Sequence, residues 1–160
     1  MKKLVIAVIS AVTAVVMCLS GSGDSSAAPV PELSTTGSDF GTFGDHSFCR
    51  GSFRVTLDAP KKTRGLVRVT VHSHGFTGDG PGWKRNPKCR VKLAAIWFSG
   101  QAYNAMKYST ATFGPKRGEK HSWDVRTGSG LVSLTVRGYT SNLPVNAPQS
   151  VGYGAFILVP

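Results

Sequence analysis

The chain has 160 residues, and its 19 Lys and Arg against 8 Asp and Glu give a formal net charge of +11. This length predicts one domain besides any targeting segment. The charge favours anionic partners and disfavours cationic ones, although it carries no information about the fold.

The first 28 residues have the pattern of a secretory signal peptide. Two lysines precede an apolar run over 4–19, and a small-residue cleavage site ends at Ala28. The apolar run is shorter than the roughly 20 residues needed to span a bilayer. A lipid anchor on Cys18 is disfavoured because Met17, rather than a small residue, precedes it. We therefore predict a signal peptide over 1–28 and a secreted mature protein without a transmembrane span.

Residues 29–47 are rich in Pro, Ser, Thr and Gly and contain no Lys or Arg. Such a segment buries too little apolar surface to offset its chain entropy. We therefore expect a flexible leader over 29–47, with Phe40 and Phe43 as the side chains able to dock on the domain.

The mature chain keeps two cysteines, Cys49 and Cys89. An even pair in an oxidising compartment predicts a disulfide. Neither belongs to a C-x-x-C pair, which disfavours a zinc site. The loop that the bridge would close contributes about 4 kcal/mol in the chain-entropy model.

Residues 48–160 are predicted to form a single all-β domain. Apolar and polar residues alternate in short runs, as in half-buried strands, and residues typical of turns separate the runs. Residues 101–111 fit either a strand or a short helix, and we favour a strand. Six to seven short strands indicate an antiparallel β-sandwich, Ig-like or jelly-roll-like, with a small β-barrel as the alternative. The runs lie at 53–58, 67–72, 89–97, 123–125, 132–137 and 151–159.

The basic residues beyond the signal peptide all fall between Arg50 and Arg137, beside only four acidic residues. On the first three predicted strands they alternate with the apolar residues and therefore point outward. If these strands belong to one sheet, its outer face would be positively charged, and we call this face the cationic plate. Loop clusters extend it, including Lys116, Arg117 and Lys120. The predicted binding residues are Arg54, Arg68, Trp83, Lys84, Arg85, Lys88, Arg90 and Lys92.

Three further patterns suggest other chemistry, each weakly. His72 and His74 share one strand face and are weak candidates for metal ligands. Glu119 and His121 are the residue types of a small secreted nuclease. The Gly-rich loop Gly75–Trp83 would suit a protein-binding module such as an inhibitor or effector.

Common hydrolase motifs are absent: there is no G-x-S-x-G, H-E-x-x-H, P-loop or dinucleotide fingerprint. No cofactor is expected. We predict a secreted, non-catalytic basic protein that binds an anionic polymer or surface, namely the cell envelope, an acidic polysaccharide or lipid head groups. Nucleic acid is a less favoured partner because the sequence contains no known nucleic-acid-binding motif. A secreted hydrolase or nuclease and a protein-binding module are the alternatives.

Overall fold

The computed structural model describes residues 27–160, so all of the predicted signal peptide except its last two residues lies outside the described residues. Ten strands and one short helix make up the described chain. They are β1 (Ala28–Pro29), β2 (Glu32–Thr35), β3 (Asp39–Phe43), β4 (Arg50–Ala59), β5 (Leu66–Thr77), α2 (Gly80–Arg85), β6 (Cys89–Ser99), β7 (Ala105–Phe113), β8 (Lys120–Arg126), β9 (Gly130–Tyr139) and β10 (Tyr153–Val159).

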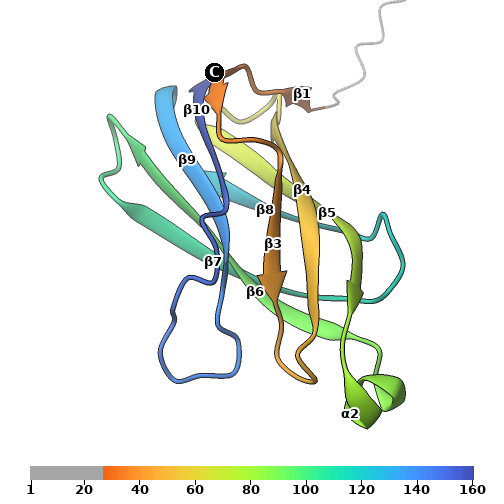
Figure 1. The fold of residues 1–160 in the computed structure, drawn as a ribbon. Coiled ribbons are helices and arrows are strands. Elements are labelled where there is room, and N and C mark those ends of the chain that lie inside the picture. The colour runs from red at the N-terminus through yellow and green to blue at the C-terminus, as the bar shows by residue number, and fades with distance from the viewer. Residues whose placement is uncertain (1–26) are drawn as a thin grey trace, which may run out of the picture.

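The strands form two antiparallel five-stranded sheets. Sheet A has the order β1-β4-β5-β8, with β3 also paired to β4, and sheet B has the order β2-β10-β9-β6-β7. Figure 1 shows α2 and the β3–β4 and β9–β10 loops at one end of the molecule, with the C-terminus near β1 at the other. The predicted all-β sandwich is confirmed, and the sheets do not close into a barrel.

Successive side chains of a strand point to opposite faces of its sheet, so every second side chain lies in the core between the two sheets. In β5, Val67, Val69 and Val71 are fully buried, while the residues between them form the outer face. An aromatic cluster fills the end of the core nearest the disulfide: the Phe53 and Phe113 rings lie 4.8 Å apart, and Phe76 stacks on Phe113 at 5.7 Å.

The predicted disulfide between Cys49 and Cys89 is present, with its Cα atoms 5.9 Å apart. It links the residue before β4 in sheet A to the first residue of β6 in sheet B. Gly44 lies so close to both sulfurs that a Cβ there would overlap them. The bridge therefore joins the two sheets directly and excludes both thiols from chemistry.

From Cys49 onward the chain forms seven strands, as predicted, and the ambiguous segment over 101–111 contains the first part of a strand, β7. The helix α2 was not predicted, because its glycines and proline indicate a turn. No helix among residues 27–160 is long and apolar enough to cross a membrane.

The expectation of a flexible leader over 29–47 is wrong as far as Phe43, because this part of the segment contains paired strands. Strand β2 pairs with β10 of sheet B, and β3 pairs with β4 of sheet A. Phe40 is buried and packs on Phe53, with ring centroids 5.7 Å apart. Sheet edges offer unpaired backbone groups, so a segment with few apolar residues gains order by supplying hydrogen bonds to them.

Candidate anion-binding face

The outer face of sheet A carries a row of charged residues from four neighbouring strands. Asp39 of β3 lies opposite Arg54 of β4, Arg54 opposite His72 of β5, and His72 opposite Lys120 of β8. Residues opposite one another in antiparallel strands have Cβ atoms about 5 Å apart and share one face. The register therefore brings three basic side chains into one line, with a single carboxylate at its end.

The next two rows along the same face are less cationic. Thr56, Thr70 and Ser122 form a row of hydroxyls, with Thr70 Oγ1 and Ser122 Oγ 2.8 Å apart. Beyond it, Arg68 donates to both carboxylate oxygens of Asp124, at 2.8 and 3.0 Å. That pair lowers the pKa of the Asp124 carboxyl and leaves the Arg68 charge matched. Of these rows, the one with Arg54, His72 and Lys120 holds the most basic residues, and the exposed Arg126 lies at the far end of β8.

A histidine–aspartate pair borders the most cationic row. His74 Nε2 lies 2.7 Å from Asp39 Oδ1, and the Arg117 guanidinium donates to His74 Nδ1 at 3.4 Å. Because Arg is only a donor, Nδ1 accepts, and Nε2 carries the proton given to Asp39. The hydrogen bonds from His74, Ser38 and Arg54 lower the pKa of Asp39 to about 2, so this carboxylate stays ionised.

A shallow cavity of about 260 Å³ lies over this part of the sheet. Burial lowers the pKa of His72, and the positive charges of Lys120 and Arg54 lower it further. The smaller contribution, from Lys120 and Arg54, is electrostatic, and an anion bound near His72 would offset it. The lining residues are Arg54, Thr56, His72, Ser73, His74, Arg117 and Gly118.

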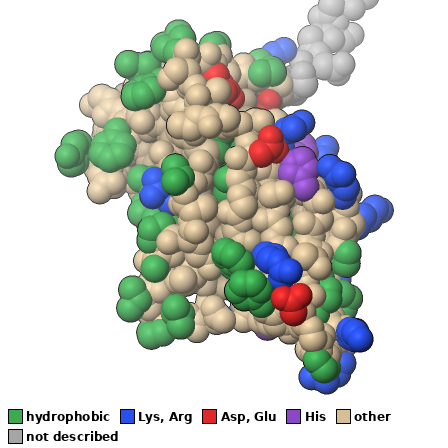
Figure 2. Space-filling model, in the orientation of Figure 1, with side chains coloured by type: hydrophobic (Ala, Val, Ile, Leu, Met, Phe, Trp, Pro, Cys, Tyr) green, Lys and Arg blue, Asp and Glu red, His purple; other side chains and the backbone are tan. Residues whose placement is uncertain are grey.

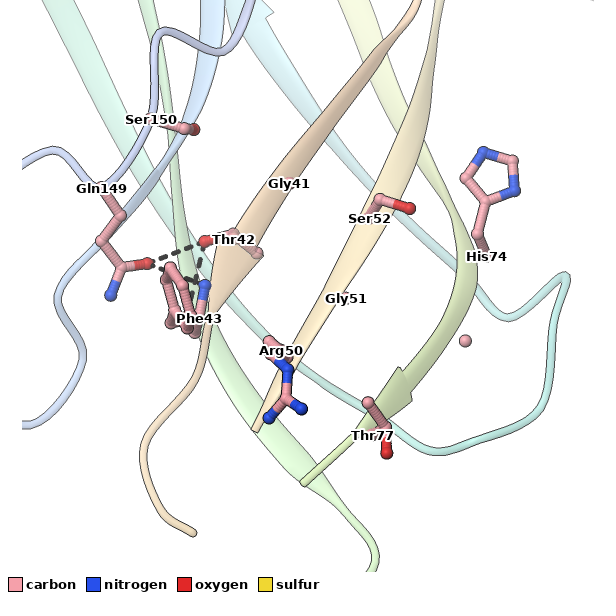
Figure 3. Close-up of a pocket in the computed structure, with 11 residues that line it drawn as sticks. Gly41, Thr42, Phe43, Arg50, Gly51, Ser52, His74, Thr77, Gln149 and Ser150 are labelled. Atoms are coloured by element: carbon pink, nitrogen blue, oxygen red, sulfur yellow. Dashed lines mark hydrogen bonds between the residues drawn. The ribbon is translucent and has the colours of Figure 1, made fainter. Parts of the chain in front are cut away.

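A larger open groove of about 550 Å³ adjoins the cavity and shares His74 with it. Figure 3 shows the groove between the β9–β10 loop and the ends of β3, β4 and β5. Its floor includes Gly41 and Gly51, and a Cβ on Gly51 would collide with the Phe76 ring. The walls offer hydrogen-bonding groups and one aromatic ring. They consist of Thr42, Phe43, Arg50, Ser52, Thr77, Gln149 and Ser150, together with His74 and Gly75.

Two of these walls are fixed by side-chain hydrogen bonds. Gln149 Oε1 accepts from the Thr42 hydroxyl at 2.8 Å and from the Phe43 N–H at 3.2 Å, which ties the β9–β10 loop to β3. Arg50 donates to Asp79 at 2.8 Å. Contacts between distant segments therefore fix the positions of Gln149 and Arg50 in the groove.

The predicted cationic plate over three strands is wrong, because those strands do not share a sheet. Arg54 and Arg68 lie on the outer face of sheet A, whereas Arg90 and Lys92 belong to β6 of sheet B. The loop and α2 between β5 and β6 carry the chain from one sheet to the other. Figure 2 shows Lys and Arg side chains beside a histidine at the upper right, over the strands of sheet A.

The remaining predicted binding residues lie outside the cavity and groove. Lys84 and Arg85 occupy the last turn of α2, and Lys88 follows it. Trp83 packs against the core, with its ring 6.2 Å from His46. The loop Gly75–Trp83, considered for protein binding, is divided between the end of β5 and α2.

The residues considered for catalysis have separate partners. The Glu119 carboxylate accepts the Gly114 N–H at 2.6 Å, and His121 Nε2 lies 2.7 Å from Ser109 Oγ. His121 lies opposite the buried Val71, and burial lowers its pKa. The geometry gives Glu119 and His121 local structural contacts instead of one shared site.

The two histidines considered for a metal do share one face, since both line the cavity. However, His72 Nε2 lies 3.2 Å from Thr56 Oγ1, while His74 is bonded to Asp39. Within residues 27–160, the one group with metal-ligand spacing is Asp45, His46 and Cys49. The Cys49 sulfur is in the disulfide, so that group offers no thiolate.

Sequence reasoning missed Asp39, which it placed in the leader, and the role of His74 beside it. The available signal for a strand was the aromatic Phe40, a residue type enriched in strands. No protein family model matches this chain, and no curated protein or solved structure matches it either. The fold and this face define a basic, disulfide-linked β-sandwich whose activity must be inferred from its own geometry.

Proposed function

We propose that the protein is secreted and binds an acidic polysaccharide through the outer face of sheet A, without cleaving it. The observation that carries the proposal is the cross-strand row of Arg54, His72 and Lys120 beside an open, hydrogen-bonding groove. The row would bind acidic groups, and the groove would hold the neighbouring sugar.

The charges of the row and of the loop beside it favour an anionic partner. Arg54 is paired with Asp39, whereas within residues 27–160 no ion pair involves Lys120 of the row or Arg117 in the loop beside it. Both side chains are exposed. Cations held side by side without counter-charges repel one another, and a polyanion removes that repulsion while releasing its own counterions.

The groove favours sugar over the other anionic polymers. A sugar ring presents hydroxyls along its edges and C–H groups on its faces. Gln149, Ser52 and Thr77 supply matching amide and hydroxyl groups, and the partly exposed Phe43 ring supplies an apolar platform. Single-stranded nucleic acid instead favours several aromatic platforms in series.

The ionisation of the carboxylates supports binding without hydrolysis. Glycosidases need one carboxyl that is protonated near neutral pH. The pKa of Asp39 is about 2 because of its hydrogen bonds to His74, Ser38 and Arg54, and pairing with Arg68 lowers the pKa of Asp124. Neither group would act as a general acid.

The test compares polymers that differ in backbone and charge. Binding of the mature protein to heparin, polygalacturonate, dextran, polyglutamate and single-stranded DNA would be measured across a salt series. We expect binding to heparin or polygalacturonate that weakens as salt rises. Binding to polyglutamate and to DNA of similar charge should be weaker, and dextran should not bind. Equal affinity for every polyanion would refute the sugar component, and salt-insensitive binding would refute the cationic row.

A further inference from the structure

The outer face of sheet B is apolar along half of its length, in contrast to that of sheet A. Leu131 of β9 lies opposite Leu158 of β10. In the next row, Phe98 of β6 and Phe156 of β10 flank Ser133 of β9. Outward positions of a two-sheet sandwich are usually polar, because the core needs only the inward ones.

These side chains are accessible and continuous with further apolar groups. Leu131 is 58% exposed and Phe156 49% exposed, and Met106 of β7 is also exposed. Tyr103, 91% exposed, places its ring edge-on to Phe98 with centroids 5.5 Å apart. Figure 2 shows hydrophobic side chains gathered at the upper left of the molecule. Contiguous apolar surface of this kind marks an interaction site.

The other half of the same face is basic and aromatic. Arg137 lies opposite Ala94, and Lys92 lies opposite Tyr139, with its Nζ 4.7 Å from the centre of the Tyr108 ring. Within strands β6, β7, β9 and β10, which the structure describes fully, no outward position carries a carboxylate. The face thus combines an apolar half with a cationic half.

We propose that the outer face of sheet B docks on the surface of an anionic lipid bilayer. Exposed Phe and Leu side chains enter the boundary between head groups and acyl chains, and Tyr prefers the same depth. Lys92, whose Nζ also donates to Asn146 at 2.6 Å, and the partly exposed Arg137 would place positive charge toward the anionic head groups, an attraction that salt screens. A second copy of the chain fits less well, because two bodies of like net charge would meet.

This proposal does not depend on the polysaccharide proposal, since the two faces are on opposite sheets. The test is flotation of the mature protein with vesicles of phosphatidylcholine alone and with added phosphatidylglycerol. Binding is expected only with phosphatidylglycerol. The double variant Phe98→Ser, Phe156→Ser should lose affinity roughly tenfold or more, because two half-exposed rings no longer leave water. The matched control Leu143→Ser changes an exposed apolar residue of the β9–β10 loop and should bind normally.

A second measurement does not require a disruptive variant. Phe156→Trp keeps an apolar ring in place, and brominated lipids should quench its added fluorescence, whereas Leu143→Trp should be unaffected. Unchanged vesicle binding of the double serine variant, or no quenching at position 156, would overturn the proposal. So would a wild-type dimer that the double variant abolishes, since the occupant would then be a second copy. Vesicle binding lost only on changing Arg117 and Lys120 would assign the lipid to sheet A and overturn it too.

Discussion

If the cationic row of sheet A binds the polymer, removing its charges should change the salt dependence of the affinity more than removing equal charges elsewhere. The change is Lys120→Gln in the row together with Arg117→Gln in the loop beside it, chosen because neither residue has an ion-pair partner among residues 27–160 and both are exposed. The matched control is Lys84→Gln with Lys88→Gln, at and just beyond the end of α2, which removes the same two charges outside the cavity.

The expected size follows from counterion release. Each contact to a flexible polyanion contributes about 0.7 to the slope of log affinity against log salt, so losing two contacts should reduce it by about 1.4. If both proteins bind equally near 1 M salt, that difference weakens binding roughly tenfold at physiological ionic strength. The control shares the lower net charge but keeps the row, so its slope should change by much less.

Isothermal titration with heparin or polygalacturonate at several salt concentrations measures both slopes. Thermal unfolding of each variant checks that the fold is retained, and exposed Lys or Arg to Gln changes should leave it nearly unchanged. Equal slopes for the two double variants would show that binding reports net charge alone, and the role assigned to the row would be wrong.

Three other changes test the groups around this face and the fold. A bound anion should raise the lowered pKa of His72, so affinity should increase as pH falls from about 7 to 5, and His72→Gln should abolish that increase in titrations. Phe40→Ala should lower the free energy of unfolding in urea by about 3 kcal/mol, whereas a flexible leader would lose nothing. Cys49→Ser with Cys89→Ser should lower it by up to about 4 kcal/mol, and reduction of the wild type should match it in calorimetry.

Periodicity predicted the strands from Cys49 onward because both sheets bury one face and expose the other. Strand β9 shows this with Val132, Leu134 and Val136 buried at every second position, whereas the ambiguous β7 buries only Phe113. The N-terminal strands lacked this signal. In β3 the buried positions are Phe40 and Thr42, and the Thr42 hydroxyl is satisfied by Gln149, far away in the sequence. A partner that distant leaves no trace in the local pattern.

The site was predictable only in part, for a related reason. Alternation tells which residues of a strand share a face, but it does not tell which sheet the strand joins. Arg54 and Arg68 were correctly placed on one face, while Lys92 was not, because the chain changes sheets between β5 and β6. Neutralisation of Arg68 by Asp124 also depended on pairing between β5 and β8.

The two outer faces are independent because the core separates them. Inward positions of both sheets must be apolar and complementary in shape, whereas outward positions meet only solvent or a partner. The outward positions of sheet A hold a cationic row and hydroxyl groups, whereas those of sheet B include Phe156 and Leu131. Side chains on the two outer faces are separated by the core, so substitutions there should act additively on stability. One protein of this size can therefore present two unlike outer faces without either compromising the core between them.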